Sequence, residues 1–415
     1  SREMLALTPL TCGLTGYQPS RLGPTHTSRG RVALSATPPN VLCVGECLFD
    51  ALPSGIFLGG APLNVACHLA ELGAKASFAS AVGDDRLGRE ALRRLRARGV
   101  DVDLVATDPT AETGFVTAEV DPAGDATYTF ATPAAWDNVL EDGLAAAAAA
   151  ADAVVFGTLA QRSGVTRAAV QEACDAARFP VLDVNLRPPY DSAELVGSAV
   201  AGGVSLLKLN DEELVPVADA LLAHYTALPE APAHLIAAAK TARSAAAAAS
   251  AAAAAAAEVL ECPVGQLGNC GEPEAPLRAS DAAMAAAGAL GRAARARWVV
   301  VTCGAAGAAL WRAAEDWEAA GEAWACAGFV PPVSAGAADS VGAGDAFLAG
   351  LLLALLGGDA SPAAALQEAC RVGAYVAGAA GATPRLEPSE IAALLPRDAT
   401  GDGCLVVPPD LMLGR

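Results

Sequence analysis

Short apolar runs separated by stretches with helical periodicity recur along most of this chain, and this alternation constrains the fold more than any other feature. Six runs rich in Val, Leu and Ala predict buried strands: residues 40–46, 76–82, 153–156, 180–184, 205–208 and 298–302. Strands that alternate with helices form a mostly parallel sheet with helices on both faces. We therefore expect an α/β domain with three layers. Ligand sites in such sheets lie at the carboxyl ends of the strands, where we place Asp183, Lys208 and Thr302.

A second β pattern lies outside this alternation. Apolar and polar residues alternate over 113–120 and 126–130, on either side of the turn sequence DPAGD. This arrangement is typical of a hairpin. With the stretch that follows Leu48, the hairpin is expected to form a small separate sheet from two segments, about residues 48–60 and 111–132.

An alanine-rich insertion, about residues 232–290, separates the last two predicted strands. Its centre, residues 245–257, is almost pure alanine, which favours a helix but offers little side-chain surface to bury. We expect a solvent-exposed helix or a disordered segment, with no catalytic role. Cys262 and Cys270 flank a glycine-rich loop there, and a pairing between them under oxidation stays open.

The charge and composition exclude several functions. The 415 residues carry 27 basic and 46 acidic side chains, a net charge of −19, which argues against nucleic-acid binding. Residues 86–98 are rich in Arg and indicate the solvated face of an amphipathic helix rather than a partner site. No run approaches the roughly 20 apolar residues that cross a membrane. The eleven cysteines and four histidines show no metal-ligand spacing, which indicates reduced thiols in an intracellular compartment.

The N-terminal residues 1–37 have the composition of an organellar transit peptide. They contain one acidic residue, four arginines and many Ser and Thr. Because hydroxyl residues outnumber regularly spaced arginines, we expect a plastid address. The alternative is an ordinary disordered tail on a cytoplasmic protein.

Residues 339–345, with the sequence DSVGAGD, run directly into an apolar stretch. A small-residue loop that opens a helix leaves backbone N–H groups unpaired, and the helix dipole favours an anion beside them. Such a loop can hold a phosphoryl group during its transfer. We interpret Asp345 as a general base that takes the proton from an attacking hydroxyl group, as in a kinase for a small hydroxylated substrate. The alternative is a tight turn followed by an ordinary acidic first-turn residue.

A second glycine-rich stretch favours the kinase interpretation. Residues 59–73 read GGAPLNVACHLAELG, and AVGDDRLG follows at residues 81–88. Paired glycines before a helix let the backbone approach a ligand, and Asn64 projects a neutral donor and acceptor from the first turn. Three more motifs lie between the two ends of the domain: DVNLRPP at 183–189, KLNDEE at 208–213 and VTCGAAG at 301–307.

In this order, the motifs resemble the two signatures of the ribokinase-like (PfkB) family of sugar and nucleoside kinases, over about residues 40–390. The resemblance implies a ribokinase-like α/β/α domain over about residues 38–400, followed by a tail at 401–415. It also implies that the small sheet is a lid, which would exclude water from the reaction. ATP and Mg²⁺ are the implied cofactors, a small sugar is the implied substrate, and homodimers through the lid occur in relatives.

The resemblance assigns roles residue by residue. Asp345 is the base, and the N–H groups of Gly342, Ala343 and Gly344 bind the transferred phosphoryl group. The sugar is expected to contact Asp50, Gly59, Gly60, Asn64, Gln161 and Arg162. The nucleotide is expected to contact Asn185, Arg187, Lys208, Thr302, Gly304 and Gly307. Asn210 and Glu213 match an Asn-x-x-Glu motif that positions Mg²⁺ through water, and Asp339 helps to hold a monovalent cation such as K⁺.

The substrate is the least constrained part of this interpretation. The GE-x-x-x-D sequence that starts at Gly45, the GGAP sequence and the NLRPP sequence resemble the fructokinase branch, which implies phosphorylation of fructose at its 6-hydroxyl group. The alternatives are 2-keto-3-deoxygluconate, for which Arg162 is the one cation we can name, ribose or another sugar. A further alternative of a different class is a catalytically inactive fructokinase-like subunit of a plastid assembly.

Overall fold

The computed structural model describes residues 37–52, 55–120, 126–140, 142–260, 274–315, 321–328, 341–358, 360–386, 390–391 and 404–407. The transit-peptide-like segment 1–36, the Cys262–Cys270 pair, Asp339 and most of the C-terminal tail lie outside these residues. Five of the described cysteines are free thiols: Cys43, Cys47, Cys67, Cys174 and Cys303. Among the described residues, no helix is both long and apolar enough to cross a membrane.

Ten strands form the main sheet, in the spatial order β14-β13-β12-β11-β10-β9-β8-β1-β4-β5. Neighbours from β11 to β5 run parallel, whereas β12, β13 and β14 are added antiparallel at one side. The bounds of the strands are β1 (Asn40–Val44), β4 (Lys75–Gly83), β5 (Val105–Asp108), β8 (Ala153–Gly157), β9 (Pro180–Asp183), β10 (Leu206–Asn210), β11 (Trp298–Thr302), β12 (Gly307–Arg312), β13 (Glu322–Ala327) and β14 (Cys404–Val407).

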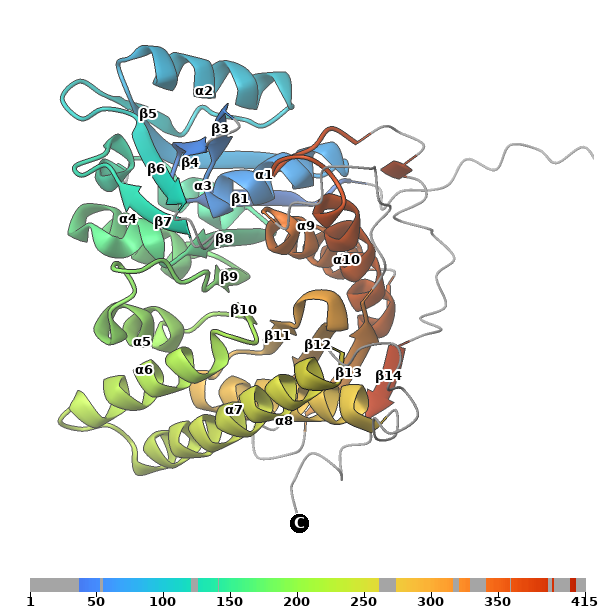
Figure 1. Ribbon diagram of the computed structural model, residues 1–415. Helices are drawn as coiled ribbons and strands as arrows, with labels where there is room; N and C mark the ends of the chain where they lie inside the picture. The colour runs from blue at the N-terminus through green and yellow to red at the C-terminus, as the bar shows by residue number, and fades with distance from the viewer. Residues whose placement is uncertain are drawn as a thin grey trace, which may run out of the picture. The chain divides into compact units, whose positions relative to one another are not determined.

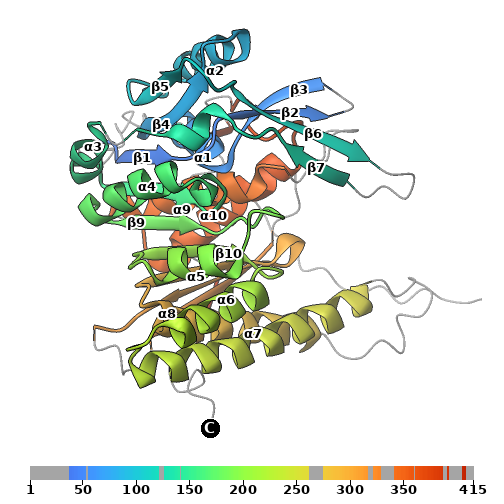
Figure 2. The same ribbon diagram turned by 90° about the vertical axis from the view of Figure 1, so that its left-hand side faces the viewer.

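Helices cover both faces of this sheet (Figures 1 and 2). The helices whose side chains enter the core on one face are α3 (Leu144–Ala150), α4 (Gly164–Ala176), α5 (Ala193–Ala201), α6 (Leu214–Ala227), α7 (Ala233–Leu260) and α8 (Glu274–Ala294). The other face is covered by α1 (Ala61–Glu71), α2 (Arg86–Ala97), α9 (Ala343–Gly357) and α10 (Pro362–Ala377). The predicted α/β/α layering with a mostly parallel central sheet is confirmed.

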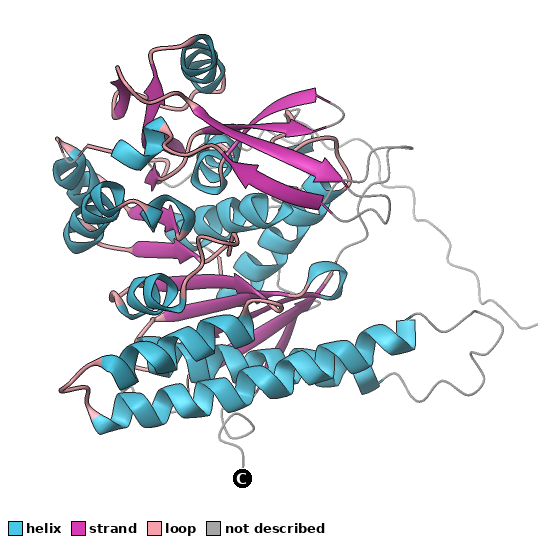
Figure 3. Ribbon diagram, turned by 60° about the vertical axis from the view of Figure 1, so that its left-hand side comes forward, coloured by secondary structure: helices cyan, strands magenta, loops and turns pink. Residues whose placement is uncertain are grey.

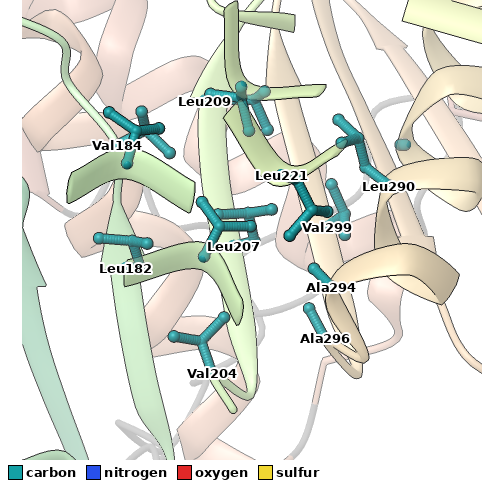
Figure 4. Close-up of a cluster of buried hydrophobic side chains, with 14 of the residues drawn as sticks. Leu182, Val184, Val204, Leu207, Leu209, Leu221, Leu290, Ala294, Ala296 and Val299 are labelled. Carbon is teal, nitrogen blue, oxygen red and sulfur yellow. The ribbon is translucent and has the colours of Figure 1, made fainter. Parts of the chain in front are cut away.

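The apolar runs of the sequence contribute side chains to the two hydrophobic cores, one on each face of the main sheet. In β10, Leu207 and Leu209 enter the core on the α6 side, while Leu206 enters the opposite core. Figure 4 shows the α6-side cluster, where Leu182, Leu207 and Val299 from three adjacent strands lie close to Leu221 and Leu290. A strand buried on two faces is apolar at most positions, with exceptions such as Lys208 in β10 near the carboxyl end, which explains why these strands appear as nearly continuous runs rather than as alternating patterns.

A separate four-stranded sheet has the order β3-β2-β6-β7 and extends away from the main sheet (Figure 2). It consists of β2 (Leu48–Leu52), β3 (Gly55–Gly59), β6 (Gly114–Val120) and β7 (Ala126–Phe130). β2 pairs antiparallel with β3 and parallel with β6, and β6 pairs antiparallel with β7. The predicted hairpin and the stretch after Leu48 therefore meet in one small sheet.

The alanine-rich segment forms α7, a long helix beside α6 and α8 (Figure 3). Four buried alanines, spaced by three or four residues, line one side of it: Ala239, Ala242, Ala246 and Ala249. This spacing places them on a single stripe of the helix. The expected helix is therefore confirmed and its other side is largely exposed, but the expectation of full solvent exposure is wrong, because a stripe without bulky side chains lets neighbouring helices come close.

Candidate active site

The anion loop predicted from the sequence begins helix α9. Gly342 has a left-handed φ of 79°, and no side chain caps the amides of the first turn. A Cβ atom at Gly342 would collide with the carbonyl oxygen of Ala382. Asp345 lies in the same turn and is buried. The loop therefore presents uncapped N–H groups at the positive end of a helix, beside a shielded carboxyl group.

A second helix N-terminus meets the first at this point. Helix α1 begins after Gly60, whose φ of 122° excludes other residues, and Asn64 lies in its first turn. The Asn64 Nδ2 atom donates a hydrogen bond of 2.8 Å to Oδ2 of Asp345, across 281 residues of sequence. The Asn64 Oδ1 atom is buried and has no hydrogen-bond partner. The two glycine-rich motifs thus converge on one carboxyl group, beside an amide oxygen without a hydrogen-bond partner.

The surroundings of Asp345 suit it for accepting a proton near neutral pH. Burial raises its pKa from 3.8 to about 6, and the negative charge of Asp183 acts in the same direction. Lys208, the hydrogen bond from Asn64 and the charge of Arg187 oppose this rise. A carboxyl group whose pKa lies within one or two units of the working pH is both basic and largely ionised there.

Lys208 and Asp183 form a buried ion pair directly beneath the loop. The Lys208 Nζ atom donates to both carboxylate oxygens of Asp183, at 2.8 and 2.9 Å, between the adjacent strands β10 and β9. A Cβ atom at Gly344 would lie 3.4 Å from this Nζ atom, so the ammonium group lies directly next to the α9 N-terminus. Burial alone would lower the pKa of Lys208, but Asp183 outweighs it and the pKa is raised. A fixed positive charge therefore supports the anion site.

Asn210 and Glu213 hold the ends of two strands in place. The Asn210 N–H donates to Glu213 Oε2, and the Glu213 N–H donates to Asn210 Oδ1, both at 2.9 Å. The Leu186 N–H donates to Glu213 Oε1 at 2.7 Å. Each carboxylate oxygen keeps a lone pair, so the pair suits a water-mediated contact with a hard cation such as Mg²⁺. The described residues contain no cluster of three His, Cys, Asp or Glu side chains that would bind a metal directly.

The predicted nucleotide contacts follow neighbouring strands. Asn185 comes just after β9 and has a φ of 45°, which is uncommon for a residue with a side chain. Thr302 ends β11, and Gly304 and Gly307 follow it closely. The charge of Arg187, which follows Asn185 closely in the chain, lowers the pKa values of Glu46, Asp50 and Asp345.

The Asp50 carboxylate lies diagonally across the β2–β3 hairpin of the small sheet from Gly59. A Cβ atom at Gly59 would come within 2.5 Å of Asp50 Oδ2, so glycine leaves the space that this carboxylate occupies. Burial raises the pKa of Asp50 to about 6, against the charge of Arg187. The small sheet therefore adds a second shielded acid near Arg187.

Gln161 and Arg162 are held by the protein itself. Gln161 Nε2 donates to the carbonyl of Gly157 at 2.8 Å. The Arg162 guanidinium pairs with both oxygens of Asp137 at 2.8 and 2.9 Å, and it lies 3.8 Å from the Trp136 ring centroid. These contacts anchor the start of α4 to the segment after β7. Only the Nη1 atom of Arg162, buried and without a hydrogen-bond partner, is left for another contact.

Two buried residues of the site were not selected from the sequence. Glu46 is 3% exposed; its Oε1 accepts the N–H of Ala61 at 2.9 Å, and its Oε2 has no hydrogen-bond partner. Burial raises the pKa of Glu46 to about 7. His68 donates from Nε2 to the carbonyl of Ala382 at 3.0 Å, and burial lowers its pKa to about 4. The glutamate after the first strand was visible in the sequence, whereas nothing in the sequence marks the partner of His68.

The model of the pfkB family carbohydrate kinases matches residues 55–249 and 236–388. This chain belongs to that family. Among curated proteins, it is 27% identical over 234 residues to the probable fructokinase-6, chloroplastic, of Arabidopsis thaliana, covering 50% of this chain and 61% of the relative. It is 32% identical over 189 residues to a fructokinase of Salmonella typhimurium, covering 42% of this chain and 61% of the relative. The matches thus span about three fifths of these relatives.

The fold has solved counterparts among pfkB kinases. The crystal structure of a fructokinase with bound ATP from Xylella fastidiosa superimposes with a TM-score of 0.59, at 22% identity, over 86% of this chain and 98% of that one. This similarity shows the fold.

Proposed function

We propose that this pfkB protein is an ATP-dependent sugar kinase that phosphorylates fructose at its 6-hydroxyl group. The single observation that carries the proposal is the convergence of two helix N-termini on the buried Asp345 through the Asn64 hydrogen bond. One terminus supplies uncapped amides for a phosphoryl group, and the other supplies polar atoms for a hydroxylated substrate.

The proposed reaction needs only alignment, one proton acceptor and charge neutralisation. The proton of the 6-hydroxyl group passes to Asp345, the sugar oxygen bonds to the γ-phosphorus, and the bond from that phosphorus to the β–γ bridging oxygen breaks to release ADP. The amides of Gly342, Ala343 and Gly344 bind the transferred group, and Lys208 supplies positive charge from below. Asn210 and Glu213 would hold Mg²⁺ through water, and the ion would neutralise phosphate charge.

Binding roles follow the same geometry. Asp50, Asn64 and the Gly59–Gly60 backbone are proposed to contact sugar hydroxyl groups, with Arg187 beside them. Asn185, Thr302, Gly304 and Gly307 are proposed to contact the nucleotide. We also propose that K⁺ binds near Asp339 and that the protein forms a homodimer through the small sheet. A plastid location is proposed as well, and the chloroplastic relative supports it.

Fructose is proposed as the substrate because both curated relatives and the structural counterpart are fructokinases. Arg162, the cation named above for a sugar acid, is already paired with Asp137, so a sugar acid would have to bind another cation such as Arg187. Ribose and other neutral sugars remain alternatives.

A coupled ADP-release assay tests the proposal with Mg-ATP and fructose, ribose, adenosine, 2-keto-3-deoxygluconate or glucose. We expect turnover on fructose, and a fall in kcat of roughly 10²–10⁴-fold in Asp345→Asn. Asp84→Asn is the matched control, because Asp84 is exposed and pairs with Arg89 outside the site. Turnover on another acceptor alone would identify that acceptor as the substrate and leave the proposed mechanism unchanged. No turnover by folded protein that binds ATP would favour the inactive plastid subunit.

A further inference from the structure

A cavity of about 360 Å³ lies among α1, α2, β3 and residues 380–385. The three labelled elements are neighbours in Figure 1. Its volume is within the range of about 300–1,000 Å³ that is usual for small-molecule sites. None of the described residues assigned above to the sugar, the nucleotide or the metal lines this cavity. It is therefore separate from the candidate active site.

Four arginines line the cavity: Arg93, Arg94, Arg98 and Arg385. In the part of the chain that the structure describes, two carboxylates pair with them. Glu90 contacts the first two guanidinium groups at 2.7 Å each. Glu71 contacts the other two, at 2.8 and 3.9 Å. Among these described side chains the arginines therefore exceed their paired carboxylates by two charges, in a chain whose net charge is −19.

The rest of the lining is largely apolar. Phe57 and Leu58 of β3 form one wall, and Leu63 and Cys67 of α1 form another. A ligand that filled this space would need a doubly charged anionic group and an adjoining apolar part. Guanidinium groups pair with phosphate oxygens in a bidentate manner and suit them better than a point charge does. We propose that this cavity binds a phosphate monoester of a small organic molecule.

The position of the cavity links it to the candidate active site. Ala382 lines it, and the carbonyl of Ala382 accepts the His68 hydrogen bond and lies against Gly342. Arg98 donates to the carbonyl of Thr383 at 2.5 Å. A bound phosphate monoester would therefore fix the segment on which the first turn of α9 rests.

Isothermal titration of the full chain with phenyl phosphate tests the proposal without relying on kinase activity. Arg93→Ala/Arg385→Ala is the test variant, because these two side chains are 68% and 63% exposed and contribute least to packing. We expect its Kd to rise about tenfold or more, as for the loss of charge-assisted hydrogen bonds. Arg89→Ala is the matched control on the same helix, since Arg89 pairs with Asp84 outside the cavity. Its Kd should equal that of the wild type.

Glu90→Gln tests the charge argument in the opposite direction. It removes the carboxylate shared by Arg93 and Arg94 and should tighten the binding of phenyl phosphate. Inorganic phosphate should bind more weakly than phenyl phosphate, because it lacks the apolar part. The proposal is overturned if the wild type binds no phenyl phosphate, if the double arginine variant binds it equally well, or if Glu90→Gln weakens binding. Equal affinity for the two probes would likewise exclude an organic monoester.

Discussion

At the scale of single residues, Gly342 and Gly358 provide a matched pair, because they flank α9 and share a φ of 79°. A Cβ atom at Gly358 meets nothing within 4 Å, whereas one at Gly342 collides with Ala382. Left-handed backbone strain of about 1–2 kcal/mol should therefore apply to both Gly→Ala variants. We expect Gly342→Ala to lose clearly more stability than Gly358→Ala in urea unfolding, and to lose ADP-release activity. Equal stability losses would contradict the close packing at the anion loop.

The raised pKa of Asp345 predicts opposite trends for activity and stability. The base must be ionised, so kcat/KM should fall as the pH drops below about 6. The free energy of unfolding follows the opposite trend, because the pKa of Asp345 is higher in the folded than in the unfolded state. The stabilisation is fully present below the unfolded pKa of 3.8 and is lost as the pH rises through about 6. His68, with its lowered pKa, gives the reverse trend between about 4 and 6.5.

Comparison with Asp345→Asn separates these contributions, because His68 is common to both proteins. As the pH rises from about 4 to 7, the unfolding free energy of the wild type should fall more, or increase less, than that of the variant. Urea titrations at several pH values measure this difference. Parallel curves for the two proteins would rule out a raised pKa at Asp345.

Sequence alone predicted the residues of this site whose role depends on backbone geometry. The paired glycines before α1 and the glycines before α9 mark two helix starts, and Asn64 and Asp345 in their first turns meet in the structure. Glu46 and His68 escaped selection for a physical reason. Their roles depend on burial and on one partner each, Ala61 and Ala382, and such contacts are set only by packing between distant segments.

At the scale of elements, the alanine stripe of α7 makes a sharp prediction. Ala246 is buried beside neighbouring helices, whereas Ala247 is exposed one residue away. Ala246→Leu should overpack this contact and lower the unfolding free energy by about 1–3 kcal/mol. Ala247→Leu should change it little, since both residues favour helices. Thermal unfolding of the two variants checks this. An unchanged unfolding free energy in Ala246→Leu would mean that the stripe is loosely packed.

Six of the seven parallel strands were predictable from their apolar runs, but β5 and the antiparallel strands β12, β13 and β14 were not. Gly307–Arg312 contains Ala and Gly at half of its positions, and Glu322–Ala327 is equally short. Their strand character comes from pairing with β11 and with each other rather than from propensity. For the same reason, the sequence could not show that one stripe of α7 is buried, since an exposed alanine helix has the same local sequence pattern.

At the scale of the whole molecule, β14 covers the backbone edge of β13 although it lies far beyond it in sequence, after α9 and α10. A variant that ends after Ile391 should fold but leave the outer N–H and C=O groups of β13 unpaired. We expect it to associate with itself in size-exclusion chromatography with light scattering. A variant that ends after Val407 keeps β14 and should behave as the full chain does. Identical elution of the two would show that β14 is dispensable.

The late position of β14 also matters while the chain is being made. Domains form as the chain emerges, and unpaired strand edges make partly formed ones prone to aggregate. The edge of β13 stays open until residues 404–407 have left the ribosome, so nearly the whole domain can be built while one side of its sheet remains a template for other nascent chains. Translation speed between β13 and residues 404–407, and chaperones that shield strand edges, should therefore influence the yield of this protein.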